Sequence, residues 1–388
     1  MLKKLLSRKR LNILGINSGT SADGIDLALI RFSLVGRKPK IAFVDGGVRQ
    51  YPAKVKTELE RYLRAEDKSA EETARLDIAL GHLLGRAAAE FIGKGRHRVN
   101  LIGSHGQTVG HYPQKKACLN FRTGTTIQIG DGDVIARRTG LPVVSDFRRA
   151  DIAGGGEGAP LTPFVNQMLF GDKTRSRIII NIGGIANYSY HPAGGDISQI
   201  RGGDCGPGNI LSDTACRLFY NRRYDLHGRI AGRGKPLQKI MAMIEKANKG
   251  RRISAGREQF DQKLLARLIH AAGGLKADRA DIVASIAAAT AQTIYKSIRP
   301  QLKDKRLEAV FLTGGGRRNR FIVDCLRKLI HPVRVQSVET LGYDGDLLEA
   351  VSFALLGGCF IMGVPSTLPH ISGGEAGGVA GKLSLPPM

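Results

Sequence analysis

The sequence predicts an α/β protein built of two related halves. Three observations carry this prediction. Stretches with strand-like apolar patterns alternate with stretches of helical period, each half opens on a strand, a glycine turn and a second strand, and glycine is abundant, at 50 of 388 residues. Alternating strands and helices are typical of a parallel or mixed sheet covered by helices. A chain of this length suffices for two domains with well-buried cores.

The first half begins with a predicted hairpin. In its second strand Ile25, Leu27 and Leu29 alternate with smaller or polar residues, which is a period of two. The elements predicted for this half are strands over residues 11–16, 25–32 and 40–45, helix over 53–92, strands over 100–103 and 126–129, a helix over 131–139 and a strand over 141–145.

The same plan starts again near residue 175, where Gly183-Gly184 separates two predicted strands. We therefore divide the chain into an N-terminal lobe, residues 1–165, and a C-terminal lobe, residues 166–388. Two facing lobes create a cleft, where a ligand is expected to bind. The elements predicted for the second half are strands over residues 177–182 and 188–191, helices over 210–220, 236–246, 259–272 and 278–298, a strand over 309–312, and helices over 319–329 and 347–362.

The chain is strongly basic, with a net charge of +25 and a pI near 10.2. A basic surface attracts polyanions. However, the lysines and arginines are scattered, and aromatic residues make up only 6% without any tryptophan, which leaves little material for stacking bases. We expect no specific nucleic-acid partner and interpret the charge as a general affinity for anionic substrates.

The five cysteines indicate reduced thiols, because their number is odd and no CxxC spacing occurs. Residues 1–6 are basic but lack the apolar core of a signal peptide. The longest apolar stretch, residues 350–364, is interrupted by two glycines and is shorter than a membrane span. These features predict a cytoplasmic protein without a membrane partner.

Three glycine turns follow predicted strands, at residues 15–26, 183–187 and 313–316. Exposed N–H groups and hydroxyls in such turns suit a phosphate, although the same residue types make ordinary turns. Taken alone, the first turn is compatible with both interpretations. The sequence lacks GxxxxGK[ST], a GxGxxG that opens a helix after the first strand, GxSxG and HExxH, which argues against Walker A, Rossmann, serine hydrolase and zinc protease sites.

Several longer motifs together resemble one family, the anhydro-N-acetylmuramic acid kinases. They occur in order and cover nearly the whole chain, so the resemblance is far more specific than any single glycine loop. The motifs are Gly15-Ile16-x-Ser18-Gly19-Thr20-Ser21-x-Asp23-Gly24, Gly103-Ser104-His105-Gly106-Gln107-Thr108, Ile127-Gln128-Ile129-Gly130-Asp131, Asp146-Phe147-Arg148-x-x-Asp151, Gly158-Ala159-Pro160-Leu161-x-Pro163, Asn181-Ile182-Gly183-Gly184-Ile185-Ala186-Asn187, Asp204-x-Gly206-Pro207-Gly208-Asn209, Thr313-Gly314-Gly315-Gly316-x-x-Asn319, Glu349-Ala350 and Leu368-Pro369.

The resemblance implies two ribonuclease H-like lobes of the actin/hexokinase/Hsp70 type around a central nucleotide and sugar cleft. It also implies a phosphotransferase that uses ATP and Mg²⁺. The implied reaction phosphorylates O6 of 1,6-anhydro-N-acetylmuramic acid while water opens the anhydro ring, giving N-acetylmuramate 6-phosphate in peptidoglycan recycling. A homodimer is common for such folds, and the sequence leaves it open.

The residues are compatible with two alternatives. The first is a kinase of the same fold for another sugar, because Gly110-His111-Tyr112-Pro113 and Glu157 depart from the family pattern. Asn17 departs from it too, replacing an apolar residue. The second alternative is a non-catalytic nucleotide sensor, against which the intact Asp23, Asp204 and Glu349 argue.

The resemblance suggests catalytic roles for Asp204, Arg148 and Glu349. Asp204 matches the base that activates water, Arg148 would neutralise phosphoryl charge, and Glu349 would lie near Mg²⁺ together with Asp23. The structural alternatives are a turn aspartate, a solvated arginine and a capping box formed by Asp346 with Glu349. The nucleotide-binding candidates are Gly19, Thr20, Ser21, Ala22, Asp23, Gly24, Ile25, Asp26, Gly183, Gly184, Gly314, Gly315, Gly316 and Asn319. The substrate-binding candidates are His105, Gln107, Thr108, Asp151, Gly206 and Asn209.

Overall fold

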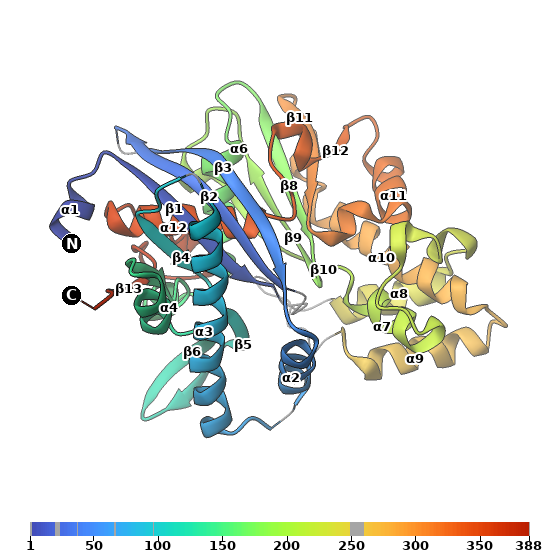
Figure 1. Cartoon of the computed structure of the whole chain (residues 1–388). Coiled ribbons are helices and arrows are strands. Elements are labelled where there is room, and N and C mark those ends of the chain that lie inside the picture. The colour runs from blue at the N-terminus through green and yellow to red at the C-terminus, as the bar shows by residue number, and fades with distance from the viewer. Residues whose placement is uncertain are drawn as a thin grey trace. The chain divides into compact units, whose positions relative to one another are not determined.

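The computed structural model describes residues 2–19, 24–36, 38–65, 67–95, 97–248 and 260–387 (Figure 1). The chain divides into two compact units. The first unit comprises Met1–Leu169 and Asp346–Met388, and the second comprises Phe170–Gly345. In the parts of the chain that the structure describes, no helix is both long and apolar enough to cross a bilayer.

The first unit is organised on a six-stranded mixed sheet with the order β13-β7-β4-β1-β2-β3. The hairpin β1–β2 and the pair β2–β3 are antiparallel, whereas β4 runs parallel to both β1 and β7. A separate two-stranded sheet contains β5 and β6. The elements of this unit are α1 (Leu2–Leu6), β1 (Arg10–Ser18), β2 (Gly24–Val35), β3 (Lys38–Gln50), α2 (Ala53–Arg64), α3 (Ala70–Lys94), β4 (Leu101–Ser104), β5 (Gln107–Cys118), β6 (Phe121–Ile129), α4 (Gly132–Thr139), β7 (Val143–Ser145), α5 (Arg149–Ala153), α6 (Thr162–Phe170, which ends one residue beyond this unit), α12 (Leu348–Ile361), α13 (Pro369–Ser372) and β13 (Lys382–Ser384).

The second unit repeats this plan in a five-stranded sheet with the order β10-β9-β8-β11-β12. Its first three strands form antiparallel pairs, and β11 lies parallel to β8 and β12. The elements are β8 (Ser176–Ile182), β9 (Ile185–His191), η1 (Ile197–Gln199), β10 (Arg201–Pro207), α7 (Ile210–Tyr220), η2 (Leu226–Gly228), η3 (Ala231–Arg233), α8 (Gln238–Asn248), α9 (Gln262–Gly273), α10 (Arg279–Ile298), η5 (Gln301–Lys303), β11 (Leu307–Thr313), η6 (Gly315–Arg318), α11 (Arg320–Ile330), β12 (Val335–Ser337) and η7 (Val338–Leu341).

The two sheets confirm the α/β class and the repeated architecture. Each contains three antiparallel strands followed by two parallel ones in the same spatial order, as expected for ribonuclease H-like units, and β13 adds an antiparallel edge strand to the first sheet. The assignment of all of residues 166–388 to one lobe differs from the structure. Residues 346–388 lie in the first unit because α12 packs on β1, β2 and β4, and β13 pairs with β7.

Close helix packing fixes α12 on the first sheet. Gly15 of β1 and Gly103 of β4 are paired neighbours. A Cβ added at Gly15 would lie 1.8 Å from the carbonyl oxygen of Ala350, and one at Gly103 would lie 2.1 Å from that of Phe353. Only glycine allows two backbones to approach this closely. Because α12 packs this closely on β1 and β4, its first turn, which carries Glu349, lies over the end of β1.

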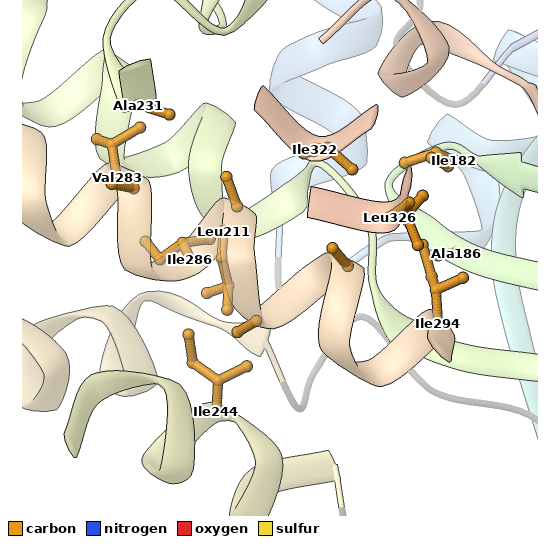
Figure 2. Close-up of a cluster of buried hydrophobic side chains, with 14 of the residues drawn as sticks. Ile182, Ala186, Leu211, Ala231, Ile244, Val283, Ile286, Ile294, Ile322 and Leu326 are labelled. Atoms are coloured by element: carbon orange, nitrogen blue, oxygen red, sulfur yellow. The ribbon is translucent and has the colours of Figure 1, made fainter. Parts of the chain in front are cut away.

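The core of the second unit surrounds α10. Thirteen residues of this helix are buried, because apolar and small side chains occur all around it. Figure 2 shows Ile286 and Ile294 of α10 among Leu211 of α7, Ile244 of α8 and Leu326 of α11. The burial of α10 on several sides makes it the central helix of this unit.

Most helix boundaries follow the predictions within three residues, with one clear exception. The predicted helix over 53–92 is two helices, α2 and α3, because the side chain of Ser69 accepts a hydrogen bond from the Glu72 amide and starts a new helix. Two features were not predicted from the sequence: β10 and the long β5–β6 hairpin. Four of the seven residues of β10 are glycine or proline, and both residue types are depleted in strands.

Candidate active site

Glu349 of α12 is joined to the end of β1 by a buried amide. The Asn17 side chain is 1% exposed, and its Nδ2 donates to Glu349 Oε2 at 2.7 Å. The same Nδ2 lies 3.4 Å from Oδ2 of Asp26, the residue opposite Asn17 on β2. The predicted capping box with Asp346 is wrong: α12 starts after Leu347 without a side-chain cap. Glu349 is instead held by a residue 332 positions away.

Glu349 is an exposed residue, although many protein atoms surround its carboxyl group. Desolvation raises the pKa of this carboxyl group above its usual value. The hydrogen bond from Asn17 and the positive charge of Arg148 act in the opposite direction and lower it. The ionised form of Glu349 is thus stabilised by Asn17 and Arg148.

Arg148 is held in one orientation by two hydrogen bonds. Its Nε donates to His105 Nε2 at 3.0 Å, and its Nη1 donates to the carbonyl oxygen of Gly158 at 2.9 Å. Its Nη2 makes no hydrogen bond with any residue that the structure describes. Burial lowers the pKa of Arg148 to about 10, while the charges of Glu349 and Asp151 raise it. The guanidinium remains cationic at neutral pH and has a free edge for an anionic ligand.

A second layer of hydrogen bonds holds the loop that binds Arg148. The buried Asp151 accepts from the Gly158 amide at 2.7 Å through Oδ2. Its Oδ1 accepts from the Ser372 hydroxyl at 2.6 Å. The Glu157 amide also donates to the Ser372 carbonyl oxygen at 2.9 Å. Asp151, predicted to bind substrate, therefore fixes the loop of Gly158 within its own unit.

His105 supports Arg148 as an uncharged ring. Because a guanidinium can only donate, His105 Nε2 must accept, so the proton of the neutral ring is assigned to Nδ1. The ring stacks on Phe353 with centroids 4.3 Å apart. Burial first, and the charge of Arg148 second, lower the pKa of His105 well below its usual value. The ring therefore positions Arg148 at neutral pH, which the sequence did not foresee.

The remaining sugar-binding candidates of this unit are also tied into the protein. Gln107 is fully buried, and its Oε1 accepts from the Ser18 hydroxyl at 2.6 Å. Ser18 accepts in turn from the Tyr51 hydroxyl at 2.9 Å, and burial raises the pKa of Tyr51 to about 12. Thr108 accepts from Gln128 at 3.2 Å. This chain of hydrogen bonds connects the ends of β1 and β3 to the start of β5.

The second unit brings its glycine turns together around Ile182. The amides of Gly208 and Asn209 donate to the carbonyl oxygens of Gly184 and Gly183 at 2.9 and 2.8 Å. The Asn209 side chain donates to the Ile182 carbonyl oxygen at 3.1 Å. A Cβ added at Gly316 would lie 2.2 Å from Ile182 Cγ2. The predicted nucleotide turns at 183–184 and 314–316 are thus neighbours.

Glycine is required at two of these positions. Gly314 has a φ of +75°, and an added Cβ would lie 2.3 Å from Asn181 Oδ1. A Cβ at Gly208 would lie 2.2 Å from the Gly183 carbonyl oxygen. In contrast, a Cβ at Gly184 would meet no heavy atom within 4 Å. The Gly183–Gly184 turn is therefore packed on one side and open at Gly184.

Asp204 lies in β10, opposite Asn187 of β9 and directly before an irregularity in the pairing at Gly206. Gly206 has a φ of +136°. The next residue, Cys205, is buried, and burial raises the pKa of its thiol to about 12, so that it stays protonated. Asn248 binds the Cys205 carbonyl oxygen at 2.8 Å. Asp204 thus lies two residues before Gly206, whose backbone conformation favours glycine.

Asn319 and Asn209 both lie at the N-terminus of a helix, but only Asn319 caps its helix with its side chain. Asn319 caps α11, because its side chain accepts from the Ile322 amide at 3.2 Å. Asn209 occupies the N-cap position of α7, but its side chain makes no capping hydrogen bond and binds Ile182 instead. Its residue type favours an N-cap, and Asn209 does hold that position, but its side chain does not cap the helix.

The first predicted phosphate loop lies partly outside the described residues. Thr20, Ser21, Ala22 and Asp23 are not among them, and Asp23 is one of the two predicted metal ligands. Gly24, Ile25 and Asp26 lie in β2 rather than in a loop. Gly19 follows the end of β1. Across the described residues no cluster of three or more His, Cys, Asp or Glu side chains is suited to hold a metal.

Three connections in the first unit were not predicted. These are the pairing of Asn17 with Glu349, the contact of Tyr51 with Ser18, and the contact of Ser372 with Asp151. Asn17 alone carried a signal, as an unexpected polar residue in an apolar strand. No spacing pattern could have identified the partners, because Asn17 and Ser372 lie 332 and 221 residues from theirs.

Comparison with known proteins assigns the family. The family model described as "Anhydro-N-acetylmuramic acid kinase" matches residues 11–384. A protein of that name from Trichormus variabilis is 37% identical over 96% of each chain, and one from Caldanaerobacter subterraneus is 32% identical over 99% of each. One from Coxiella burnetii is 35% identical over 95% of this chain and 96% of its own. The chain belongs to the anhydro-N-acetylmuramic acid kinase family.

Likeness to solved structures is weaker. The activator of 2-hydroxyisocaproyl-CoA dehydratase from Clostridium difficile is 13% identical and has a TM-score of 0.45, with 90% of this chain and 96% of that chain covered. A ROK family glucokinase from Streptomyces griseus has a TM-score of 0.37, with 89% of this chain and 99% of that chain covered. These scores are too low to carry a conclusion about function.

Proposed function

We propose that this chain is a cytoplasmic, ATP- and Mg²⁺-dependent kinase of 1,6-anhydro-N-acetylmuramic acid that takes part in peptidoglycan recycling. The observation that carries the proposal is the family match over residues 11–384, which includes every candidate catalytic residue. The product is N-acetylmuramate 6-phosphate. The enzyme is thus a phosphotransferase with an alcohol oxygen as acceptor.

The proposed reaction joins a hydrolysis to a phosphoryl transfer. Water attacks C1 of the sugar, the bond between C1 and O6 breaks, and O6 takes the γ-phosphoryl group of ATP, leaving ADP. The Asp204 carboxylate accepts the proton of the attacking water, in the role of a general base. Gly206 and Asn209 follow Asp204 in the chain, and we assign them to the sugar site with it.

Arg148 would stabilise the negative charge of the transferred group. Its Nε and Nη1 are engaged by His105 and Gly158, so the guanidinium presents Nη2 in a fixed direction. A donor that is already oriented loses little freedom when it binds an anion, which favours catalysis. In this proposal His105 and Asp151 act through Arg148. We also assign Gln107 and Thr108 of the first unit to sugar binding.

The residues around Asn17 suit a magnesium ion. Mg²⁺ is commonly bound by one or two carboxylates together with substrate phosphates. Asp26 and Glu349 both supply a carboxylate oxygen within 3.4 Å of Asn17 Nδ2. We propose Glu349 and Asp23 as the side chains that hold the ion, with Asp26 beside them. The bound ion would neutralise charge on the nucleotide phosphates.

The nucleotide site would be formed mainly by backbone. In the second unit we propose Gly183, Gly184, Gly314, Gly315 and Gly316, with Asn319 fixing the start of α11 beside them. The open position at Gly184 supports this assignment, because it leaves room for a phosphate to approach the backbone. In the first unit we propose Gly19, Thr20, Ser21, Ala22, Asp23, Gly24, Ile25 and Asp26.

The direct test is incubation of the protein with ATP, Mg²⁺ and 1,6-anhydro-N-acetylmuramic acid, followed by mass spectrometry. We expect a product that has gained one water and one phosphoryl group, with oxygen-18 from labelled water at C1. A phosphorylated product without the added water would contradict the coupled reaction. ATP binding without any product from a panel of sugars would favour a nucleotide sensor.

A kinase for a different sugar is the second candidate. The aromatic ring of Tyr112 lies against Gly110, where an added Cβ would be 2.8 Å from Tyr112 Cε2. Gly110 and Tyr112 belong to the segment whose sequence departs from the pattern that the resemblance implies. The panel of sugars therefore includes other anhydro sugars, and a higher kcat/KM for one of them would establish the alternative.

A further inference from the structure

The hairpin β5–β6 ends in a tip that is both basic and apolar. Residues 107–129 contain no acidic residue, and Lys115, Lys116 and Arg122 are all exposed. Between these cations Leu119 is 87% exposed and Phe121 is 74% exposed. Large apolar side chains are seldom this exposed next to one another on a soluble protein unless they serve an interaction.

The hairpin receives little support from the rest of its unit near the tip. It forms a two-stranded sheet of its own, and both faces are exposed over residues 116–123. Figure 1 shows the two strands extending from the body of the unit to a free turn. Two strands alone are marginally stable in water. A ligand that covers the tip would supply the missing burial.

The turn itself carries backbone strain. Leu119 and Asn120 have φ values of +47° and +65°, so both lie in the left-handed region. Two-residue hairpin turns of this type prefer Asn or Gly at both positions, and a leucine there is disfavoured sterically. A strained position that holds a largely exposed leucine indicates a use for that side chain.

We propose that this tip is a docking site for an anionic lipid surface. Aromatic and aliphatic side chains enter the interface of a bilayer, and nearby lysines and arginines bind its acidic headgroups. A second copy of the chain fits less well, because two basic tips would repel each other. Stable protein interfaces bury about 800 Å² per partner, which a narrow convex turn does not offer, whereas a headgroup layer closes around it.

The test is sedimentation of the whole protein with vesicles of phosphatidylglycerol and phosphatidylcholine, compared with vesicles of phosphatidylcholine alone. We expect binding only to the anionic vesicles, and a loss of binding at high salt. Lys116→Glu with Arg122→Glu should lower the partition coefficient more than 20-fold, since each basic residue near such a surface changes it about fivefold. Lys303→Glu with Lys305→Glu, two exposed cations of the second unit, is the matched control.

A second variant tests the contribution of the apolar side chains to vesicle binding. It is chosen so that the hairpin should stay folded. Leu119→Asn places a preferred residue in the turn while it removes the apolar side chain, so the hairpin should be retained. Combined with Phe121→Thr it should lower vesicle binding at least tenfold, whereas Leu218→Gln, at an exposed leucine of α7, should not.

Three results would overturn the proposal: equal pelleting of the tip variant and the unaltered protein, no pelleting with either vesicle, or a dimer in light scattering that only the tip variant loses. The kinase assay with soluble sugar is independent of this test. It should be unaffected by the tip variants, because none of these residues belongs to the proposed active site.

Discussion

The two units share a strand order but use different means to build their candidate sites. In the first unit the site consists of side chains that hydrogen-bond over long sequence separations, such as Asn17 with Glu349 and Arg148 with His105. In the second unit it consists of main-chain turns that touch one another, with glycine at the points of contact. The same topology thus supports a charged site in one sheet and a backbone site in the other.

This difference follows from the residues that end the first strand of each sheet. β1 ends with Asn17 and Ser18, whose side chains bind α12 and β5. After β8 the chain has Gly183 and Gly184, which have no side chain and accept hydrogen bonds from Gly208 and Asn209. Removing one side-chain hydrogen bond in the first unit should therefore reduce activity and stability only in part. Adding a side chain at a glycine contact in the second unit should disrupt the packing.

The largest expected effect concerns Asp204, the one carboxylate proposed for chemistry in the backbone-built unit. If it is the general base, Asp204→Asn should reduce kcat by about 10²–10⁴-fold. ATP affinity should stay unchanged, because the turns at 183–184 and 314–316 are retained. Steady-state kinetics and calorimetry measure the two quantities. The control is Asp324→Asn on α11, and a near-normal kcat for the Asp204 variant would exclude the assigned role.

Gly208→Ala tests whether the second unit depends on close backbone contact. Its Cβ would lie 2.2 Å from the Gly183 carbonyl oxygen, and overpacking of this kind costs about 3 kcal/mol in the free energy of unfolding. Gly184→Ala is the matched variant, with no atom within 4 Å, and should change that free energy by less than about 0.5 kcal/mol. It should nevertheless weaken ATP binding. Urea unfolding with and without ATP distinguishes the two, and equal stability losses would refute the comparison.

Ser372→Ala tests whether losing one side-chain hydrogen bond in the first unit causes only a partial loss of stability and activity. It leaves Asp151 Oδ1 without its buried donor, which should cost about 1–3 kcal/mol in the free energy of unfolding. A loosened Gly158 loop should also reduce kcat about tenfold through Arg148. If Ser372 acts through Asp151, its effect should largely disappear in an Asp151→Asn background. Ser33→Ala is the control, and additive losses in kcat would show that Ser372 does not act through Asp151.

Periodicity and glycine turns predicted the fold well because they are local. The strands and helices of the second unit from β8 to α11 follow the predicted ranges closely, apart from β10, whose glycines hide its strand character. The domain boundary was harder to predict. The return of α12 to the first sheet depends on glycines at positions 15 and 103, which allow close packing, and these have no local signature of a distant partner.

The site was predictable in composition but not in connectivity. The candidates His105, Arg148 and Asp151 do lie together, yet their order of contact was unforeseen. His105 and Asp151 were expected to bind sugar, whereas their hydrogen bonds point to Arg148 and its loop. Short polar side chains in a motif give no indication of whether they bind a ligand or each other, because both uses need the same donors and acceptors.

The smallest expected effect is a shift in pH dependence caused by Asn17. Desolvation raises the pKa of Glu349 above 4.5, and the hydrogen bond from Asn17 opposes this. If the ionised carboxylate is needed, kcat/KM should rise with pH through that raised pKa. Asn17→Val removes the donor, so the acidic limb should move to higher pH, while activity at alkaline pH should match that of the unaltered protein.

The raised pKa of Glu349 also predicts how the free energy of unfolding changes with pH. A carboxyl group with a raised folded pKa binds its proton more tightly in the folded protein, so the free energy of unfolding falls as pH rises from about 4.5 through the folded pKa. Asn17→Val should increase this loss, with little difference between the proteins below pH 4.5. Asn12→Val on the same strand, whose side chain donates to the Arg98 carbonyl oxygen, is the control for both measurements. An acidic limb that stays in place would show that the contact of Asn17 with Glu349 does not control the ionisation that matters for turnover.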